Sequence, residues 1–191
     1  LWDMRSKACI HTLTGHRDAV TAVLAADTAP QITTASADST IRLWDIVAGK
    51  TIVTLTHHKK GLRALVKHPA EESMVSGGAD AVKRWALPEG RFLHNMAGDS
   101  LDIGATHNTV VNALAVNDDG VLVGGTDDGR LMVWDWGSGA LCQSTSAPSQ
   151  PGSLECEGGV LACHFDRTGM RLLTGHVDKT IKVWGEADIG E

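Results

Sequence analysis

The chain has 191 residues and a formal net charge of −6, a balance atypical of a non-specific nucleic-acid binder, because phosphate neutralisation dominates such binding. It contains 21 Gly, no Tyr and two Phe, which suits many short strands joined by tight turns. No apolar run approaches the roughly 18 residues needed to span a bilayer, and we expect neither a membrane span nor a signal peptide.

Tryptophan returns at regular intervals, each time at the end of a short β-like run. Five of the six Trp form a series with spacings of 42, 41, 49 and 50 residues: Trp2, Trp44, Trp85, Trp134 and Trp184. A period of about 40–45 residues ending in Trp-Asp is typical of a propeller blade, which buries its apolar face only by stacking on neighbours. We therefore predict an all-β propeller of about four and a half blades, whose ends these Trp mark; Trp136 stands outside the series.

Each repeat can be read as four short strands, the first of which completes the preceding blade. Asp-Gly, Gly-Gly and Asn-Asp pairs separate the runs, as hairpins require. In chain order we predict strands at residues 9–13, 20–24, 31–35, 40–44, 51–55, 62–67, 73–77, 82–85, 91–96, 110–116, 121–125, 130–134, 140–145, 160–165, 171–175 and 180–184.

Two repeats are longer than the others. Their extra residues fall at 97–106 and at about 146–157, in both cases just before an inner strand. We expect both to be loops on one rim of the propeller. Insertions grouped on one face often mark the face that binds.

A histidine, a hydroxyl, an aspartate and a tryptophan recur at matching positions. An imidazole between a carboxylate and a hydroxyl, with an indole N–H nearby, satisfies every polar group without water, so we predict one buried network per blade. Gly124 replaces the hydroxyl in the third set, and no matching Gly-His is visible in the fourth. The sets are His16, Thr34, Asp38 and Trp44; His58, Ser76, Asp80 and Trp85; His107, Asp128 and Trp134; and Thr174, Asp178 and Trp184.

The same His, Asp and hydroxyl pattern is also that of a hydrolase triad. A catalytic site occurs once, whereas this pattern repeats in every blade, and no nucleophile elbow accompanies it. We therefore predict a non-enzymatic protein without catalytic residues.

Two histidine positions are candidates for a metal site. His57 and His58 are adjacent, and His176 alternates with Asp178 as on a strand. Because metal ligands must converge, we favour hydrogen-bonded or solvent-facing histidines and predict neither metal nor cofactor. The cysteines lack zinc-ligand spacing and are expected to be reduced intracellular thiols: Cys9, Cys142, Cys156 and Cys163.

Basic residues cluster at Lys59, Lys60 and Arg63, and again at Lys83 and Arg84. One interpretation is a solvated face that keeps the protein soluble. The other is a patch for an acidic peptide or an RNA backbone. No aromatic residues interleave with these cations, so we do not expect base stacking on the patch.

The Gly-His, Asp and Trp-Asp pattern resembles the WD40 family across essentially the whole chain. Residues 40–69, 121–136, 150–166 and 171–184 resemble the C-terminal repeats of the pleiotropic regulator family, the WD40 subunit of the spliceosomal NineTeen-associated complex. The QPGSL segment that starts at Gln150 is the most specific feature, because generic WD40 repeats lack it. Ala86 and Gly185 depart from the pattern, since both replace the Asp after Trp.

The resemblance implies a nuclear, non-catalytic scaffold in pre-mRNA splicing, within a seven-bladed propeller. Residues 1–191 would be the C-terminal part of that single domain, and the last blade would take its outer strand from an N-terminal part. The implied partners are the Myb-like cell-division-cycle subunit, the SNW/SKIP protein and other NineTeen-associated and snRNP subunits, with RNA contact at most peripheral and no membrane.

A short motif at the start of the chain supports an alternative function. Trp2, Asp3 and Arg5 resemble the end of the WDxR box, by which some WD40 proteins dock on the damaged-DNA-binding adaptor of cullin-RING ubiquitin ligases. The chain would then be a substrate receptor, with Arg5 reaching an acidic pocket of the adaptor. The plainer alternative is an ordinary strand end with an exposed arginine.

Overall fold

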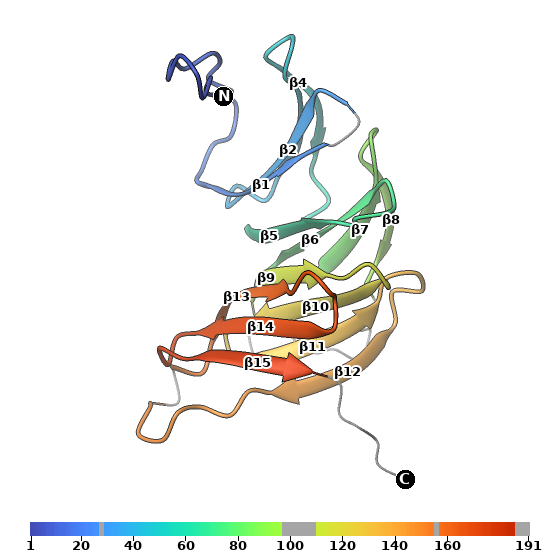
Figure 1. Ribbon diagram of the computed structural model, residues 1–191. Coiled ribbons are helices and arrows are strands. Elements are labelled where there is room, and N and C mark those ends of the chain that lie inside the picture. Colours follow the sequence, from blue (N-terminus) through green and yellow to red (C-terminus); the bar gives the residue numbers. More distant parts are fainter. Residues whose placement is uncertain (27–28, 97–109, 155–156, 186–191) are drawn as a thin grey trace.

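The computed structural model describes residues 1–26, 29–96, 110–154 and 157–185. Within these ranges fifteen strands form four antiparallel sheets, in which each strand pairs with its neighbour in sequence (Figure 1). The strands are β1 (Val20–Ala25), β2 (Gln31–Ser36), β3 (Ile41–Asp45) and β4 (Lys50–Leu55) in the first sheet; β5 (Leu62–Lys67), β6 (Ser73–Gly78), β7 (Val82–Ala86) and β8 (Arg91–Asn95) in the second; β9 (Val111–Val116), β10 (Val121–Thr126), β11 (Arg130–Asp135) and β12 (Leu141–Ser146) in the third; and β13 (Val160–Phe165), β14 (Arg171–His176) and β15 (Ile181–Gly185) in the fourth.

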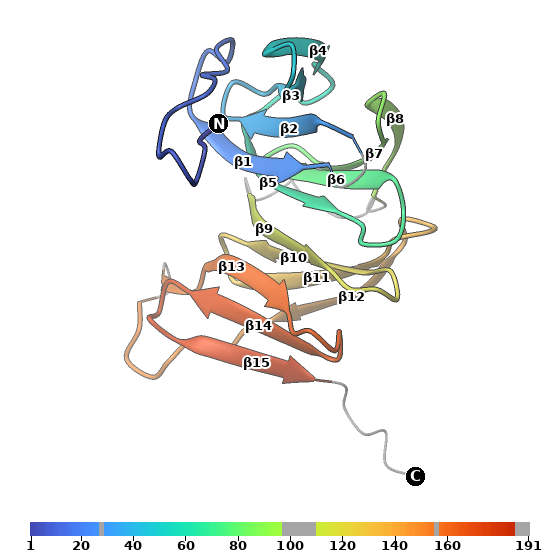
Figure 2. The ribbon, with the colours of Figure 1, turned by 45° about the horizontal axis from the view of Figure 1, so that its top comes forward.

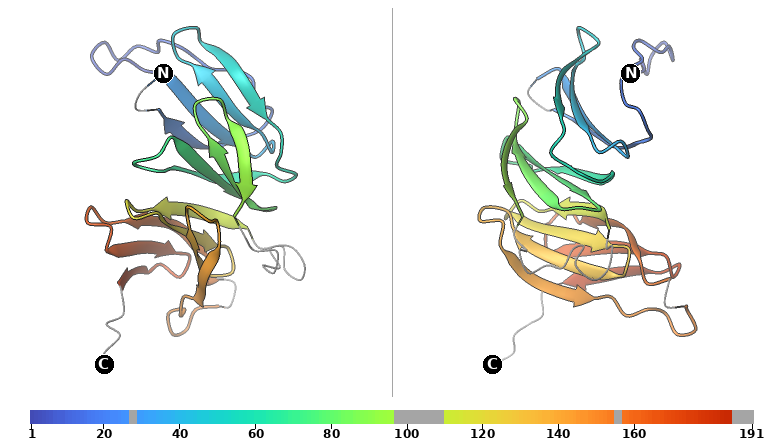
Figure 3. Two further views of the ribbon diagram at one scale, coloured as in Figure 1. Left: turned by 90° about the vertical axis from the view of Figure 1, so that its right-hand side faces the viewer. Right: turned by 180° about the vertical axis from the view of Figure 1, so that it is seen from behind.

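The sheets are arranged as successive blades of a propeller. The first strands of the sheets lie side by side in chain order, with β1 against β5, β5 against β9 and β9 against β13. The remaining strands fan outward from this inner row (Figures 2 and 3). The prediction of a partial all-β propeller is therefore confirmed. The described part of the chain holds no helix long and apolar enough to cross a membrane.

The predicted strands between residues 20 and 184 agree with the observed ones within one residue at either end. The prediction for residues 9–13 was wrong, because among the described residues this segment forms only an isolated bridge between Trp2 and Cys9. The blade boundaries also need correction. Trp44, Trp85 and Trp134 lie in third strands, and each sheet continues into a fourth strand beyond them.

The hydrophobic core is divided among the interfaces between blades. One cluster joins the first two sheets through Leu43, Leu65 and Trp85, a second contains Trp134, and a third includes Val160. The indoles of the first three blades are at most 2% exposed. Each aromatic side chain of this size removes about 150–250 Å² from water, so the stacking of blades contributes substantially to stability.

The inner strands approach their neighbours very closely. A Cβ added at Gly125 on β10 would lie 2.5 Å from the Cγ1 of Val160 on β13, so only glycine allows this contact. The pairing of each inner strand also shifts by one residue near its start, which leaves one residue there without a ladder partner. These bulged positions carry different side chains in the four blades: Thr21, Arg63, Asn112 and Leu161.

Candidate functional site

The first blade contains the predicted buried network. The Trp44 indole N–H donates to Thr34 Oγ1 at 2.8 Å, and that hydroxyl lies 2.8 Å from His16 Nε2. The other ring nitrogen of His16 lies 3.0 Å from an Asp38 carboxylate oxygen. In the neutral imidazole, Nδ1–H donates to Asp38 and Nε2 accepts from Thr34, so all four side chains are satisfied.

The Asp38 carboxylate is held ionised by its neighbours. Burial acts to raise its pKa, but hydrogen bonds from the Thr40 hydroxyl, the Arg17 amide and His16 outweigh burial and hold the pKa well below its ordinary value. Thr40 Oγ1 donates to Asp38 at 2.6 Å, and the Arg17 amide donates at 2.9 Å. The carboxylate therefore ties the loop before β1 to the turn between β2 and β3.

The second blade repeats the same chain of contacts. Trp85 Nε1 donates to Ser76 Oγ at 2.8 Å, and Ser76 Oγ lies 2.8 Å from His58 Nε2. His58 Nδ1 lies 2.7 Å from Asp80. Burial acts to raise the pKa of Asp80. The hydrogen bond from His58 is the largest of the contacts that outweigh burial and hold this pKa below its ordinary value. Ser76 is completely buried, and its oxygen accepts the indole N–H, so its surroundings are not those of a nucleophile.

The fourth blade supplies its histidine from a place that the sequence did not indicate. His176 Nε2 lies 2.8 Å from Thr174 Oγ1, which accepts the Trp184 indole N–H at 2.8 Å. Asp178 instead pairs with Lys182 Nζ at 3.0 Å. The sequence feature that could have revealed this contact is the two-residue spacing of Thr174 and His176, because side chains two residues apart on a strand share one face of the sheet.

Only part of the predicted network of the third blade can be described, because His107 lies outside the described residues. A Cβ at Gly124 would lie 2.8 Å from the Trp134 ring, so the indole occupies the space where other blades carry a hydroxyl side chain. The hydroxyl of Thr126 donates to Asp128, and Asp128 also pairs with Arg130 Nε at 3.1 Å. This blade therefore anchors its aspartate differently.

The two predicted basic groups do not form one patch. Lys59, Lys60 and Arg63 are exposed at and just before the start of β5, and Arg63 is its bulged residue. Lys83 and Arg84 are consecutive on β7 and so point to opposite faces of the sheet. Lys83 Nζ donates to Asn95 Oδ1 at 3.2 Å on one face.

Arg84 lies in the contact between the second and third blades. Its guanidinium donates to Glu71 Oε2 at 2.6 Å and to the Trp136 carbonyl at 2.8 Å, and it stacks 5.2 Å from the Trp136 ring. The first and third blades have Leu43 and Val133 at this position of the third strand. Arg84 thus contributes to blade packing, and its candidacy as a partner-binding residue is not supported.

Trp136, the tryptophan outside the repeating series, completes this contact. It is 1% exposed, and its indole N–H donates to Glu71 at 3.1 Å and to Ser73 at 3.2 Å. Burial acts to raise the pKa of Glu71, while the indole hydrogen bond and the Arg84 charge lower it below its ordinary value. We call Arg84, Glu71 and Trp136 the interblade clip. The sequence alone does not reveal it, since its members come from two blades.

The segment around Trp2 forms a tight turn. Asp3 accepts hydrogen bonds from the Arg5 amide at 2.9 Å and from the Ser6 hydroxyl at 2.6 Å. Asp135 forms the same kind of turn, accepting from the Ser138 amide at 2.7 Å. Trp2 and Arg5 are exposed. The candidate adaptor motif is therefore a surface turn of the type found between third and fourth strands.

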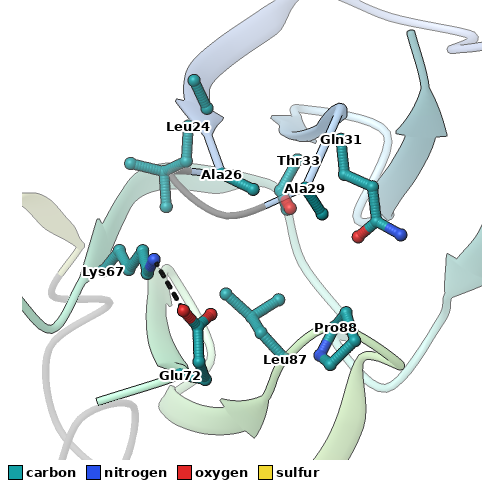
Figure 4. Close-up of a pocket in the computed structure, with 10 residues that line it drawn as sticks. Leu24, Ala26, Ala29, Gln31, Thr33, Lys67, Glu72, Leu87 and Pro88 are labelled. Atoms are coloured by element: carbon teal, nitrogen blue, oxygen red, sulfur yellow. Dashed lines mark hydrogen bonds and ion pairs between the residues drawn. The ribbon is translucent and has the colours of Figure 1, made fainter. Parts of the chain in front are cut away.

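Small cavities occur between the blades. One, lined by Leu24, Gln31 and Leu87 beside the Lys67–Glu72 ion pair of 3.4 Å, holds about 20 Å³, which is room for roughly one water (Figure 4). Among the described residues no three His, Cys, Asp or Glu side chains gather as metal ligands would. His57 stacks on Phe92 with ring centroids 5.4 Å apart, away from any such group.

The chain is similar to known proteins both by family and by individual relatives. The profile of the family described as "WD domain, G-beta repeat" matches residues 7–45, 99–135 and 149–185. The chain is 49% identical over 138 residues to the Arabidopsis thaliana protein pleiotropic regulator PRL2, and 52% identical over 124 residues to mouse pleiotropic regulator 1. It is 41% identical over 137 residues to the Candida glabrata pre-mRNA-splicing factor PRP46.

These alignments cover 72%, 65% and 72% of this chain but only 27%, 23% and 30% of the relatives, so the chain spans about a quarter of their length. The expected resemblance to the pleiotropic regulator proteins is confirmed at this level. The family profile leaves residues 46–98 unmatched, yet the structure places a complete four-stranded blade there. With its repeats matched and its blades stacked around one inner row of strands, the chain belongs to the WD40 repeat family.

Proposed function

We propose that this chain is part of a non-catalytic WD40 scaffold that acts in pre-mRNA splicing in the nucleus. The observation that carries the proposal is the identity of 41–52% to the pleiotropic regulators and to a relative named as a pre-mRNA-splicing factor. Because the chain covers only part of these relatives, we assign it a contribution to the scaffold rather than the whole activity.

The geometry of the blades supports a scaffold rather than an enzyme. The groups that could act as bases or nucleophiles, such as His58 and Ser76, are bonded to one another and to an indole in the interior. The same arrangement serves the first and fourth blades. Function then depends on exposed side chains that differ between blades, because binding residues commonly lie on loops that a rigid framework holds in place.

The exposed cations at the start of β5 are the surface we assign to partners. Lys59, Lys60 and Arg63 belong to one loop and the bulge that follows it, so they share one rim of the second blade. The chain has a net charge of −6, so three cations on one rim form a local positive surface. Such a surface favours binding of an acidic protein segment. The partner proteins we propose are the Myb-like cell-division-cycle subunit, the SNW/SKIP protein and other NineTeen-associated and snRNP subunits.

Affinity purification from nuclear extract tests this function. The tagged chain should retain spliceosomal proteins and small nuclear RNAs, and the proteins should stay bound after ribonuclease treatment. Retention that disappears with ribonuclease would point to RNA as the ligand, and absence of spliceosomal subunits from the purified material would contradict the proposal.

Docking on a cullin-RING ligase adaptor is a second candidate. The turn formed by Asp3 holds the exposed Arg5 at the surface, as a docking arginine requires. Arg5→Ala should then abolish adaptor binding while spliceosomal retention is unchanged. Adaptor binding that is equal in both proteins would exclude this role for Arg5.

A further inference from the structure

The segment that connects β12 to β13 is attached to both of the blades it joins. The Ala147 amide donates to the Gly129 carbonyl at 3.0 Å, in the turn between β10 and β11. The Gln150 amide donates to Asp178 Oδ2 at 3.1 Å, in the turn between β14 and β15. Ala147 is 8% exposed, and the side chain of Asp178 is fully buried. The segment is therefore anchored in the third blade at one point and in the fourth blade at another.

Gln150 occupies a position that the first two blades also use. There the amides of Arg17 and Lys59 donate to the aspartates of their own blades at 2.9 and 3.0 Å. Arg17 and Lys59 stand three residues before β1 and β5, whereas Gln150 stands ten residues before β13. The residues that lengthen this repeat therefore begin at Pro151, directly after the anchor, and they share a rim with the cations of the second blade.

Residues 150–153 form a tight turn whose residue types match its backbone. The Ser153 amide donates to the Gln150 carbonyl at 3.0 Å and closes the turn. Pro151 fixes the first central φ, and Gly152 has φ of 91° at the second central position. This is a type II turn, in which the second central residue needs positive φ and is usually glycine or asparagine. The four residues therefore specify one backbone conformation.

The residue after this turn, Leu154, combines a fixed backbone with an exposed side chain. Its amide donates to Glu157 Oε2 at 3.1 Å, and its carbonyl accepts from the Glu157 amide at 2.9 Å. Leu154 is nevertheless 66% exposed. A flexible loop loses conformational freedom when it binds, whereas this one is already ordered by the fold. A partner therefore gains the burial of the leucine at little further cost in entropy.

The chemistry of this segment restricts what binds to it. Residues 146–154 carry no charged side chain, and Pro151 is exposed in the same turn. The segment projects beyond the sheets of the third and fourth blades (Figure 1). Binding of a nucleic acid or an acidic peptide requires cations, which are missing here. An exposed leucine in a fixed position instead fits an apolar pocket, because the burial of aliphatic surface then supplies the affinity.

We propose that residues 150–154 form a docking turn, from which Leu154 inserts into an uncharged apolar pocket of a folded protein partner. The anchor at Gln150 and the type II turn set the position of the leucine, and the leucine makes the contact. The inference rests on the proposed scaffold function, since it describes the surface that a partner of this scaffold presents. The docking turn is distinct from the cations at the start of β5, which we assign to an acidic segment.

Site-specific photocross-linking in nuclear extract tests this contact. The photoreactive residue p-benzoylphenylalanine replaces Gln150, whose side chain is exposed and whose anchor uses only the backbone amide. In a matched control it replaces Val47, which is 76% exposed on the turn between β3 and β4. We expect a cross-link from position 150, and not from position 47, that mass spectrometry maps to apolar residues of one folded protein.

Two further substitutions show whether Leu154 makes the contact. In the chain with the photoreactive residue at position 150, Leu154→Ser should lower the cross-link yield about tenfold, while Leu154→Met should retain it, because methionine has a similar apolar volume. An unchanged yield in Leu154→Ser would overturn the proposal, as would a cross-link only to RNA, only to a second copy of this chain, or to nothing. A cross-linked protein from outside the spliceosome would contradict the proposed function and leave the docking turn supported.

Variants of Gly152 test whether the turn positions the leucine. A Cβ at Gly152 meets no atom within 4 Å, so Gly152→Ala causes no clash and acts only through strain at positive φ. We expect Gly152→Ala to lower the cross-link yield about three- to tenfold, while Gly152→Asn, which tolerates positive φ, retains most of it. Circular dichroism should show the same fold in all these chains. Equal yields from Gly152→Ala and the chain with glycine would overturn the role of the turn.

Discussion

The second and fourth blades both join an indole, a hydroxyl and an imidazole by hydrogen bonds, but they take these groups from different parts of the repeat. In the second blade His58 comes from the loop before β5 and joins Ser76 to Asp80. In the fourth blade His176 comes from β14 itself, and Lys182 takes over the carboxylate. Both blades therefore place a hydroxyl and an imidazole beside the indole, although the histidine comes from different places in the repeat.

The two blades also differ in how well they are covered. Trp85 is fully buried between β8 and the first blade, while Trp184 on β15 is only partly buried. The second blade should therefore be more stable than the fourth, although both have hydrogen bonds that join an indole, a hydroxyl and an imidazole.

Removing the indoles should give the largest effect. We expect Trp85→Ala to lower the free energy of unfolding by about 3–5 kcal/mol, because it leaves a large cavity. Trp184→Ala should cost clearly less, since less of that side chain is removed from solvent contact. Urea unfolding measures both, and an equal or larger loss for Trp184→Ala would contradict the difference in burial.

Removing the central hydroxyl should affect the two blades alike. Ser76→Ala and Thr174→Val each leave an indole N–H and an imidazole nitrogen without their shared partner, so each should lower the free energy of unfolding by about 2 kcal/mol. Chemical denaturation compares them directly. Thr54→Val, on the fourth strand of the first blade, serves as the control for loss of a hydroxyl. A near-zero effect at either network site would show that its chain is not stabilising.

The interblade clip should have a somewhat smaller effect. Arg84→Met retains an unbranched side chain but removes the contacts to Glu71 and the Trp136 carbonyl, with an expected loss of about 1–2 kcal/mol. Arg84→Lys should not restore it, because an ammonium lacks the planar fork. Thermal unfolding would show this, and full stability in Arg84→Lys would mean that charge alone is sufficient.

The fourth blade should show a pH dependence that depends on His176. Burial and, next, the Lys182 charge lower the pKa of His176 below 6.5. The unfolded chain then binds a proton that the folded chain does not, so stability is lost as pH falls from about 6.5 through the lower folded pKa. His176→Gln should reduce this loss. Denaturation at about pH 7.5 and about pH 5.5, on either side of the ordinary histidine pKa, tests it, and an unchanged pH dependence would assign the effect to another group.

Much of the fold could be predicted from the sequence because local signals agree in every repeat. The Trp period, the alternating strands and the turn residues all indicate the same blade, and two of the polar networks follow from residues at matching positions. The strand at residues 9–13 was predicted wrongly, since among the described residues this segment forms only the isolated bridge between Cys9 and Trp2.

The rest of the candidate site could not be predicted because it depends on contacts between blades. Trp136 has no repeat partner, and its role with Glu71 depends on how the second and third blades stack. Arg84 belonged to an apparent basic patch in sequence but points into that interface. His176 could have been found from its alternation with Thr174, but the repeat pattern directed the expectation to a Gly-His pair.

The difference between the interior and the rim leads to the most direct test of the function. The triple variant Lys59→Glu, Lys60→Glu and Arg63→Glu should be measured for retention of spliceosomal proteins and for its unfolding midpoint, beside the control Lys50→Glu, Arg91→Glu and Arg167→Glu, whose residues are also exposed. We predict that the rim variant loses the proteins with stability changed by no more than about 0.5 kcal/mol, while the control retains them. Equal retention by both variants would contradict the assignment of this rim to partner binding.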